Sequence, residues 1–145
     1  MSLPDWERNG WLQSHKSSAN EVRDLLAVVE RDLADSAAEG LSADWQMNIA
    51  YNAALQAATV ALAAAGYRAS RDQHHYRIIQ SLETLGTDAS TVNTFDTFRK
   101  KRNAVGYDRA SLVSDADANA MRTLAQRLKA DVVQWLRKHH PELLK

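Results

Sequence analysis

Apolar side chains recur along most of the chain at the three- and four-residue spacing of one face of an α-helix. Five glycines, at positions 10, 40, 66, 86 and 106, separate segments of helical length. No stretch alternates apolar and polar residues as a half-buried strand does. The pattern therefore predicts an all-α fold, an up-and-down bundle of about five helices.

Start and stop signals place these helices. Ser, Thr, Asp and Asn favour helix N-termini, whereas Gly and Pro favour the residues just beyond a C-terminus. In chain order, the expected starts and ends are Ser18 and Gly40, Ser42 and Gly66, Ser70 and Gly86, Asp88 or Ser90 and Gly106, and Ser114 and Pro141. We expect residues 1–17, which include two tryptophans, to form an arm or a short helix, and residues 18–145 to form the helical bundle domain.

The second of these helices is rich in alanine, which accounts for nine of the sixteen residues from Ala50 to Ala65. Small side chains let neighbouring helices approach closely, so this helix is expected to be central. A neutral polar stripe, with members about one turn apart, runs along it: Asn48, Asn52, Gln56 and Thr59. The stripe indicates either a solvated or inter-helix polar seam, or the lining of a cleft or self-association face.

Composition narrows the possible chemistry. The 145 residues include 18 Lys and Arg and 18 Asp and Glu, so the net charge is zero and any basic site must be local. Cysteine is absent, which excludes disulfides, thiolate zinc sites and a cysteine nucleophile. No two histidines have the i, i+4 spacing of a helical zinc site, and no glycine-rich phosphate loop occurs. We expect neither a metal nor a cofactor.

Two further features bear on location. The first residues carry neither a basic nor an apolar signal region, and amide side chains interrupt the long uncharged stretch from 45 to 67. We therefore expect no signal peptide, no association with a membrane and a cytoplasmic protein.

The segment from Arg99 to Arg109 holds five basic residues and one acidic residue, a local charge of +4. Within it, Arg102 follows Phe95 and Phe98 on the same apolar stripe. A guanidinium on a core-facing stripe is costly unless it is paired or used. Three interpretations stay open: a buried ion pair, a side chain that reaches water at the helix end, or an arginine held in a groove or subunit interface ready to bind phosphate.

The other cations of this segment, Arg99, Lys100, Lys101 and Arg109, would form a weaker rim. His74 and His75 are adjacent and point about 100° apart on a helix, so they cannot easily share a metal. They are either cleft residues or surface and capping imidazoles.

Residues 102–108, Arg-Asn-Ala-Val-Gly-Tyr-Asp, resemble the signature of HEPN domains, in the branch that lacks the motif histidine. Two further segments are similar to that family. One is the Tyr- and Ala-rich helix from Tyr51 to the Gly-Tyr-Arg corner at Arg68, and the other is the His-led helix from His74 to Leu82. The resemblance covers about residues 18–140.

The resemblance implies a homodimer of helical bundles whose motifs meet in a cleft that binds or cuts RNA. Arg102 would bind phosphate, Asn103 would be the polar residue after it, and Tyr107 would stand where cutting members carry histidine. A phenol has a pKa of about 10 against about 6.5 for imidazole, so it is a poor proton shuttle at neutral pH. Tyr51 and Asn52, with the two adjacent histidines, are candidate cleft residues. A nucleotidyltransferase-like antitoxin would be a possible partner.

Three functions follow as hypotheses. The first is a HEPN-like dimer that binds RNA or a nucleotide through Arg102 with weak or no catalysis. The second is a toxin-type, metal-independent RNase in which Tyr107 or a histidine from elsewhere replaces the missing base. The third is a helical interaction module in which Arg102 is purely structural. The surroundings of Arg102 distinguish the third hypothesis from the first two.

Overall fold

The structure is a computed structural model that describes residues 2–107 and 113–145, with only the backbone described for residues 104–107. In chain order, the elements are α1 (Leu3–Arg8), β1 (Leu12–Ser14), α2 (Ala19–Ser36), α3 (Ala43–Ala64), β2 (Tyr67–Ala69), α4 (His74–Thr84), α5 (Ala89–Tyr107) and α6 (Asp115–His139), followed by a 3-10 turn at Pro141–Leu144. This arrangement confirms the predicted all-α bundle, with α1 as a short additional helix. Among the described residues, no helix is long and apolar enough to cross a bilayer.

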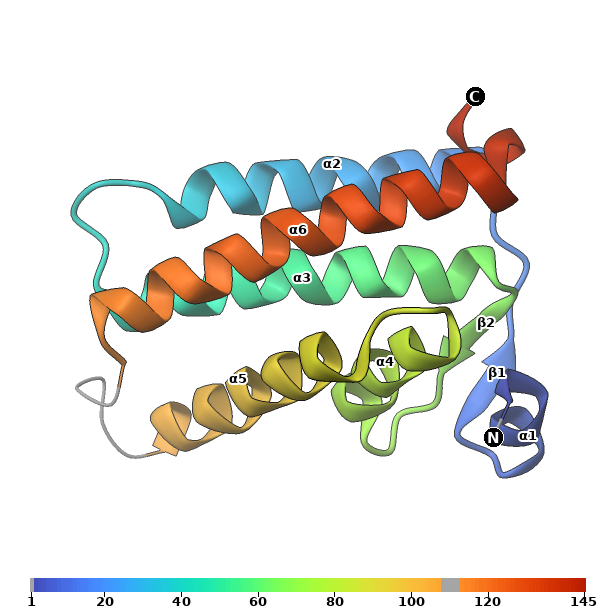
Figure 1. Cartoon of the computed structure of the whole chain (residues 1–145), viewed down its shortest axis with the longest axis horizontal. Helices are drawn as coiled ribbons and strands as arrows, with labels where there is room; N and C mark the ends of the chain where they lie inside the picture. Colours follow the sequence, from blue (N-terminus) through green and yellow to red (C-terminus); the bar gives the residue numbers. More distant parts are fainter. Residues whose placement is uncertain (1, 108–112) are drawn as a thin grey trace.

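Helix α3 lies at the centre of the bundle, as its alanine content predicts. It packs against α2, α4, α5 and α6, and Figure 1 shows α2 and α6 on one side of it and α4 and α5 on the other. Its inward alanines are completely buried: Ala50, Ala53, Ala54, Ala57 and Ala58. Because a methyl group holds neighbouring backbones only a short distance apart, four helices can contact this one.

The helix ends match the sequence signals in part. Ser114 and Asp117 form a reciprocal capping box at the start of α6. The Ser18 hydroxyl accepts a hydrogen bond from the backbone N–H of Glu21, at 3.2 Å, but the Glu21 carboxylate turns away to His15. The Glu21 side chain therefore contacts the N-terminal arm and does not complete a capping box at Ser18.

The predicted cap at Ser70 is wrong. Helix α4 begins at His74, after Gln73 in a left-handed conformation with φ of 53°. Ser70 instead continues the chain from a two-stranded ribbon: its N–H donates to the Trp11 carbonyl at 2.9 Å, and its hydroxyl donates to the Gly10 carbonyl at 2.8 Å. A serine engaged on both sides in this way is not available to cap a helix.

The N-terminal residues dock on the bundle through that ribbon. Strand β1 pairs antiparallel with β2, with Gln13 opposite Arg68. The Trp6 and Trp11 rings meet edge to face at 5.8 Å, and the Arg77 guanidinium of α4 lies 3.7 Å from the centroid of Trp11. Strands of three residues are too short to show alternation, which is why the sequence pattern missed them.

Candidate functional site

Two hollows meet at Arg102 and Asn103, near the C-terminal end of α5. The first, of about 700 Å³, is lined from α2 and α3 by Asp32, Trp45, Asn48, Ile49 and Asn52. The second, of about 530 Å³, is lined by Gln73, His74, His75, Tyr76 and Arg99. Because both share Arg102 and Asn103, we call the two together the Arg102 groove. It brings together side chains from four helices.

Arg102 is partly buried and has an aromatic ring behind it. Its guanidinium carbon lies 5.1 Å from the ring centroid of Tyr51, a residue that is only 1% exposed. No carboxylate of residues 2–107 or 113–145 comes within ion-pair distance of Arg102. Within that part of the chain, the ion-pair interpretation is not observed. Contact with an aromatic face stabilises the cation while its N–H groups stay available.

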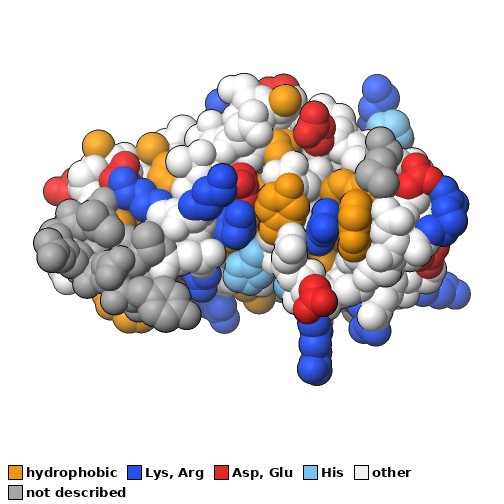
Figure 2. All heavy atoms as spheres, turned by 90° about the horizontal axis from the view of Figure 1, so that it is seen from below, with side chains coloured by type: hydrophobic (Ala, Val, Ile, Leu, Met, Phe, Trp, Pro, Cys, Tyr) orange, Lys and Arg blue, Asp and Glu red, His pale blue; other side chains and the backbone are white. Residues whose placement is uncertain are grey.

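The neighbouring cations, in contrast, are held by acids. Asp96 accepts from Arg99 at 2.7 Å and lies 3.5 Å from the Lys100 ammonium. Lys101 pairs with Asp117 of α6 at 2.8 Å. Figure 2 shows Lys and Arg side chains gathered around exposed histidine surface on the face of α4 and α5. Two carboxylates therefore offset part of the positive charge, and Arg102 differs from these neighbours in having no carboxylate within ion-pair distance among the described residues.

Two of the predicted site residues cannot be placed in the same way. Arg109 lies outside the described residues, and of Tyr107 the structure describes the backbone at the end of α5.

Tyr51 and His75 form a neutral pair beneath the groove. A hydrogen bond of 3.3 Å joins the Tyr51 hydroxyl and His75 Nδ1, and the Tyr51 ring meets Phe95 edge to face. Burial raises the pKa of the Tyr51 phenol to about 12, with Arg102 acting in the opposite direction. Burial also lowers the pKa of His75 below its ordinary 6.5, and the positive charge of Arg102 adds to that effect. Both rings are consequently uncharged at neutral pH.

The residues of the polar stripe of α3 have different surroundings. Asn48 and Asn52 line the groove, whereas the Thr59 hydroxyl donates to the Leu55 carbonyl at 2.8 Å, away from it. The Asn52 amide donates to the carboxylate of Asp32 at 2.7 Å. That carboxylate is buried, and it also accepts from Arg31 at 3.1 Å. Asn48 and Asn52 therefore lie at the groove, and Asn52 also forms a polar contact between α3 and α2.

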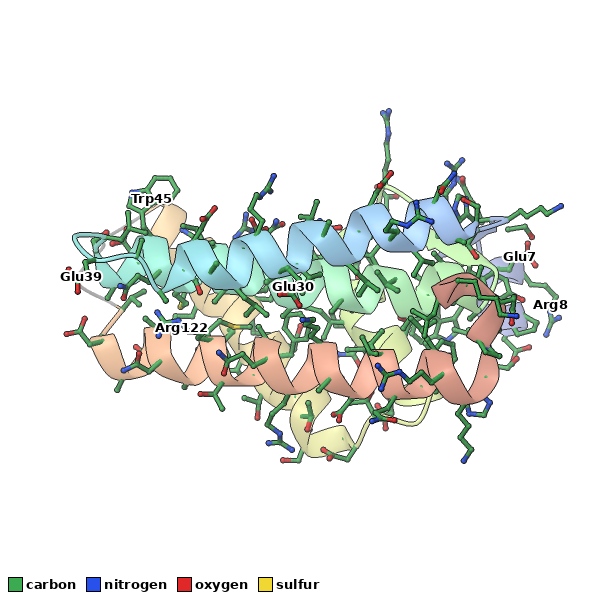
Figure 3. All side chains as sticks on the ribbon, turned by 90° about the horizontal axis from the view of Figure 1, so that it is seen from above. Glu7, Arg8, Glu30, Glu39, Trp45 and Arg122 are labelled. Atoms are coloured by element: carbon green, nitrogen blue, oxygen red, sulfur yellow. The ribbon has the colours of Figure 1, made fainter. Side chains whose placement is uncertain are left out.

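Sequence reasoning missed Asp32 and Trp45. Asp32 stands on another helix, and only the packing of α2 on α3 brings it to Asn52. The Trp45 side chain projects from the first turn of α3, as Figure 3 shows, and is 59% exposed. In the sequence, the position of Trp45 three residues before Asn48 could have indicated that this large aromatic side chain lies near the polar stripe.

The remaining histidines lie elsewhere. His15 contacts both carboxylate oxygens of Glu21 at 2.8 Å, and His139 and His140 pack on Trp135 at the end of α6. Across the described part of the chain, no three His, Asp or Glu side chains are grouped so as to hold a metal ion.

Comparison of the chain with protein-family models, curated proteins and solved structures finds no match.

Proposed function

We propose that this protein is a HEPN-like helical dimer that binds RNA or a nucleotide through Arg102, with weak or no catalysis. The observation that carries the proposal is the setting of Arg102. Its guanidinium lines both hollows of the groove, rests on the Tyr51 ring and lies beyond ion-pair distance of every carboxylate in the described residues.

A phosphate is the ligand that suits this setting best. The planar fork of Arg donates two parallel hydrogen bonds to neighbouring phosphate oxygens. Its partial burial excludes some water, so each charged hydrogen bond is worth more than on an open surface. The exposed amide of Asn103 lies beside it and can donate to the same group. In a helical interaction module with a purely structural Arg102, we would expect an ion pair with an internal acid, and no such pair occurs among the described residues.

The paired cations give a weaker contribution. Lys100 has a side chain that is 71% exposed and shares Asp96 with Arg99. Interactions of such a cation with a nucleic acid are screened by salt. Lys100 should therefore affect mainly the salt dependence of binding, and Arg102 the affinity itself.

The test is a titration of the protein with short RNA and with mononucleotides at two salt concentrations. Arg102→Ala should weaken binding about tenfold or more, since a charged hydrogen bond is worth about 1.5–3 kcal/mol. Arg102→Lys should also weaken it, because the ammonium lacks the fork. Lys100→Ala is the matched control and should mainly flatten the salt dependence. Circular dichroism verifies the fold of each variant. Wild-type affinity in folded Arg102→Ala would favour the interaction module instead.

Dimerisation is the second part of the proposal. The groove is open to solvent at Arg102 and Asn103, so pairing of two α5 helices would bring two such arginines to one cleft. The HEPN resemblance implies the same arrangement, and a nucleotidyltransferase-like antitoxin is the partner it implies in the cell.

A metal-independent RNase is the second candidate, and His75 is the observation that favours it. This imidazole lines the groove with Arg102 and is neutral at pH 7, so it is able to accept a proton from a ribose hydroxyl. Purified protein that cleaves RNA without metal, and loses cleavage in both His75→Ala and Arg102→Ala, would establish this function. We expect little or no cleavage by the wild type, and Tyr107→His to raise it.

A further inference from the structure

The lining of the Arg102 groove includes an exposed indole. Trp45 is 59% exposed, whereas the next most exposed large apolar side chains, Leu41 and Leu144, reach 37% and 36%. It lines the hollow of about 700 Å³ together with Arg102 and Asn103. Figure 3 shows the side chain standing away from the body of the bundle.

Packing accounts for the other three tryptophans but not for Trp45. Trp6 is 8% exposed and meets Trp11, which lies under the Arg77 guanidinium, and Trp135 packs on two histidines. Among the described residues, Trp45 has neither an aromatic nor a cationic partner. Its broad apolar face is therefore available to a flat ligand.

Amide side chains line the same hollow as this indole and Arg102. Asn48 is one turn of α3 further on, and within the described residues neither it nor Asn103 makes a side-chain hydrogen bond. Asn52 uses its NH₂ group on Asp32, which leaves its carbonyl oxygen. A primary amide offers one acceptor and two donors, the groups that pair with the edge of a nucleobase.

We infer that Trp45 is a stacking platform for one unpaired nucleobase whose phosphate lies at Arg102, with Asn48 and Asn103 at the base edge. This inference rests on the proposed function and narrows its ligand. The hollow falls within the range of about 300–1,000 Å³ of small-ligand sites. A base inside a duplex has both faces stacked and its pairing edge occupied, so the expected ligand is a free nucleotide or a single-stranded RNA, not a double-stranded one.

The experiment compares ligands that differ only in the base. Adenosine 5′-monophosphate and ribose 5-phosphate are titrated into wild type, Trp45→Ala, Trp45→Phe and Arg102→Ala, with Leu41→Ala as the control for loss of an exposed apolar side chain. Trp45→Ala should lower the affinity for the nucleotide about tenfold and leave the affinity for ribose 5-phosphate unchanged. Trp45→Phe should keep most of the affinity for the nucleotide. Arg102→Ala should weaken both ligands. Circular dichroism again verifies the folds.

Fluorescence gives a second readout. The nucleotide, but not ribose 5-phosphate, should quench wild-type emission, and Trp45→Phe should lose that quenching. Equal affinity of wild type and Trp45→Ala for the nucleotide, or equal weakening of both ligands, would overturn the stacking platform while the Arg102 site stands. Binding of neither ligand nor single-stranded RNA to the wild type would overturn both. A second copy of the chain would cover the indole if wild-type emission changed with protein concentration, Trp45→Phe lacked that change and Trp45→Ala were a monomer. That result would also overturn the stacking platform.

Discussion

Replacing Asp96 by Asn should lower the stability of the protein and, at the same time, raise its affinity for nucleic acid. Asp96 is 8% exposed and pairs with two cations of α5, the Arg99 guanidinium at 2.7 Å and the Lys100 ammonium at 3.5 Å. The amide of Asn fills the same space and still accepts a hydrogen bond from Arg99. The substitution therefore removes the negative charge and little else.

The size of each effect follows from burial. The Asp96 and Arg99 side chains are 12% and 20% exposed, whereas that of Lys100 is 71% exposed. The Lys100 pair contributes little, so the loss in the free energy of unfolding comes mainly from Arg99 and should be about 1 kcal/mol. Each cation released to a phosphate of single-stranded RNA should steepen the plot of log affinity against log salt by about 0.7.

Two measurements check this prediction: denaturant unfolding, and titration with short single-stranded RNA at several salt concentrations. Asp131→Asn is the matched control, because it makes the same change in charge at an exposed position of α6 that does not line the groove. An Asp96→Asn variant whose binding has wild-type salt dependence would refute the claim that Asp96 keeps Arg99 and Lys100 from binding phosphate. So would a control that steepens the plot as much.

Three further outcomes are expected. The pKa of His75 is lowered in the folded protein, so the unfolded chain binds a proton at a higher pH than the folded chain does. The free energy of unfolding should therefore keep its full value above pH 6.5 and fall as the pH drops below 6.5. Unfolding curves of His75→Gln should lack this part of the pH dependence. Arg77→Ala should free the N-terminal arm while the bundle stays folded, seen as a change in Trp11 emission and faster proteolysis of residues 1–17, because it removes a guanidinium 3.7 Å from the ring centroid. Light scattering should give about twice the 16.2 kDa mass of one chain, and a monomer at high concentration would contradict the proposed dimer.

The fold was largely predictable because its helices are long and periodic. The alanine count alone placed α3 at the centre, and Ser114 marked the start of α6. The errors lie where contacts distant in sequence override local signals. Ser70 has the side chain of a helix cap, but its hydroxyl donates to the Gly10 carbonyl of the arm. Glu21 follows Ser18 at the spacing of a capping box, but its carboxylate contacts His15.

The site was predictable in one respect and not in another. The phase of Arg102 relative to Phe95 and Phe98 indicated a partly buried guanidinium, and the structure places it over Tyr51. The phase of one helix does not specify what faces it from other helices, so the sequence did not indicate that Trp45 shares a groove with Arg102 or that acids pair with the rim cations.

The most direct test of the account is to observe the arginine itself. Nitrogen-15 spectra of the arginine side chains are recorded while adenosine 5′-monophosphate is added, and the signal of Arg102 is identified by its loss in Arg102→Ala. We expect the Arg102 Nε–H signal to shift in a saturable way and the signal of Arg99, held by Asp96 at 2.7 Å, to move little. An unmoved Arg102 signal at nucleotide concentrations that shift other arginines would contradict the claim that this residue binds the phosphate.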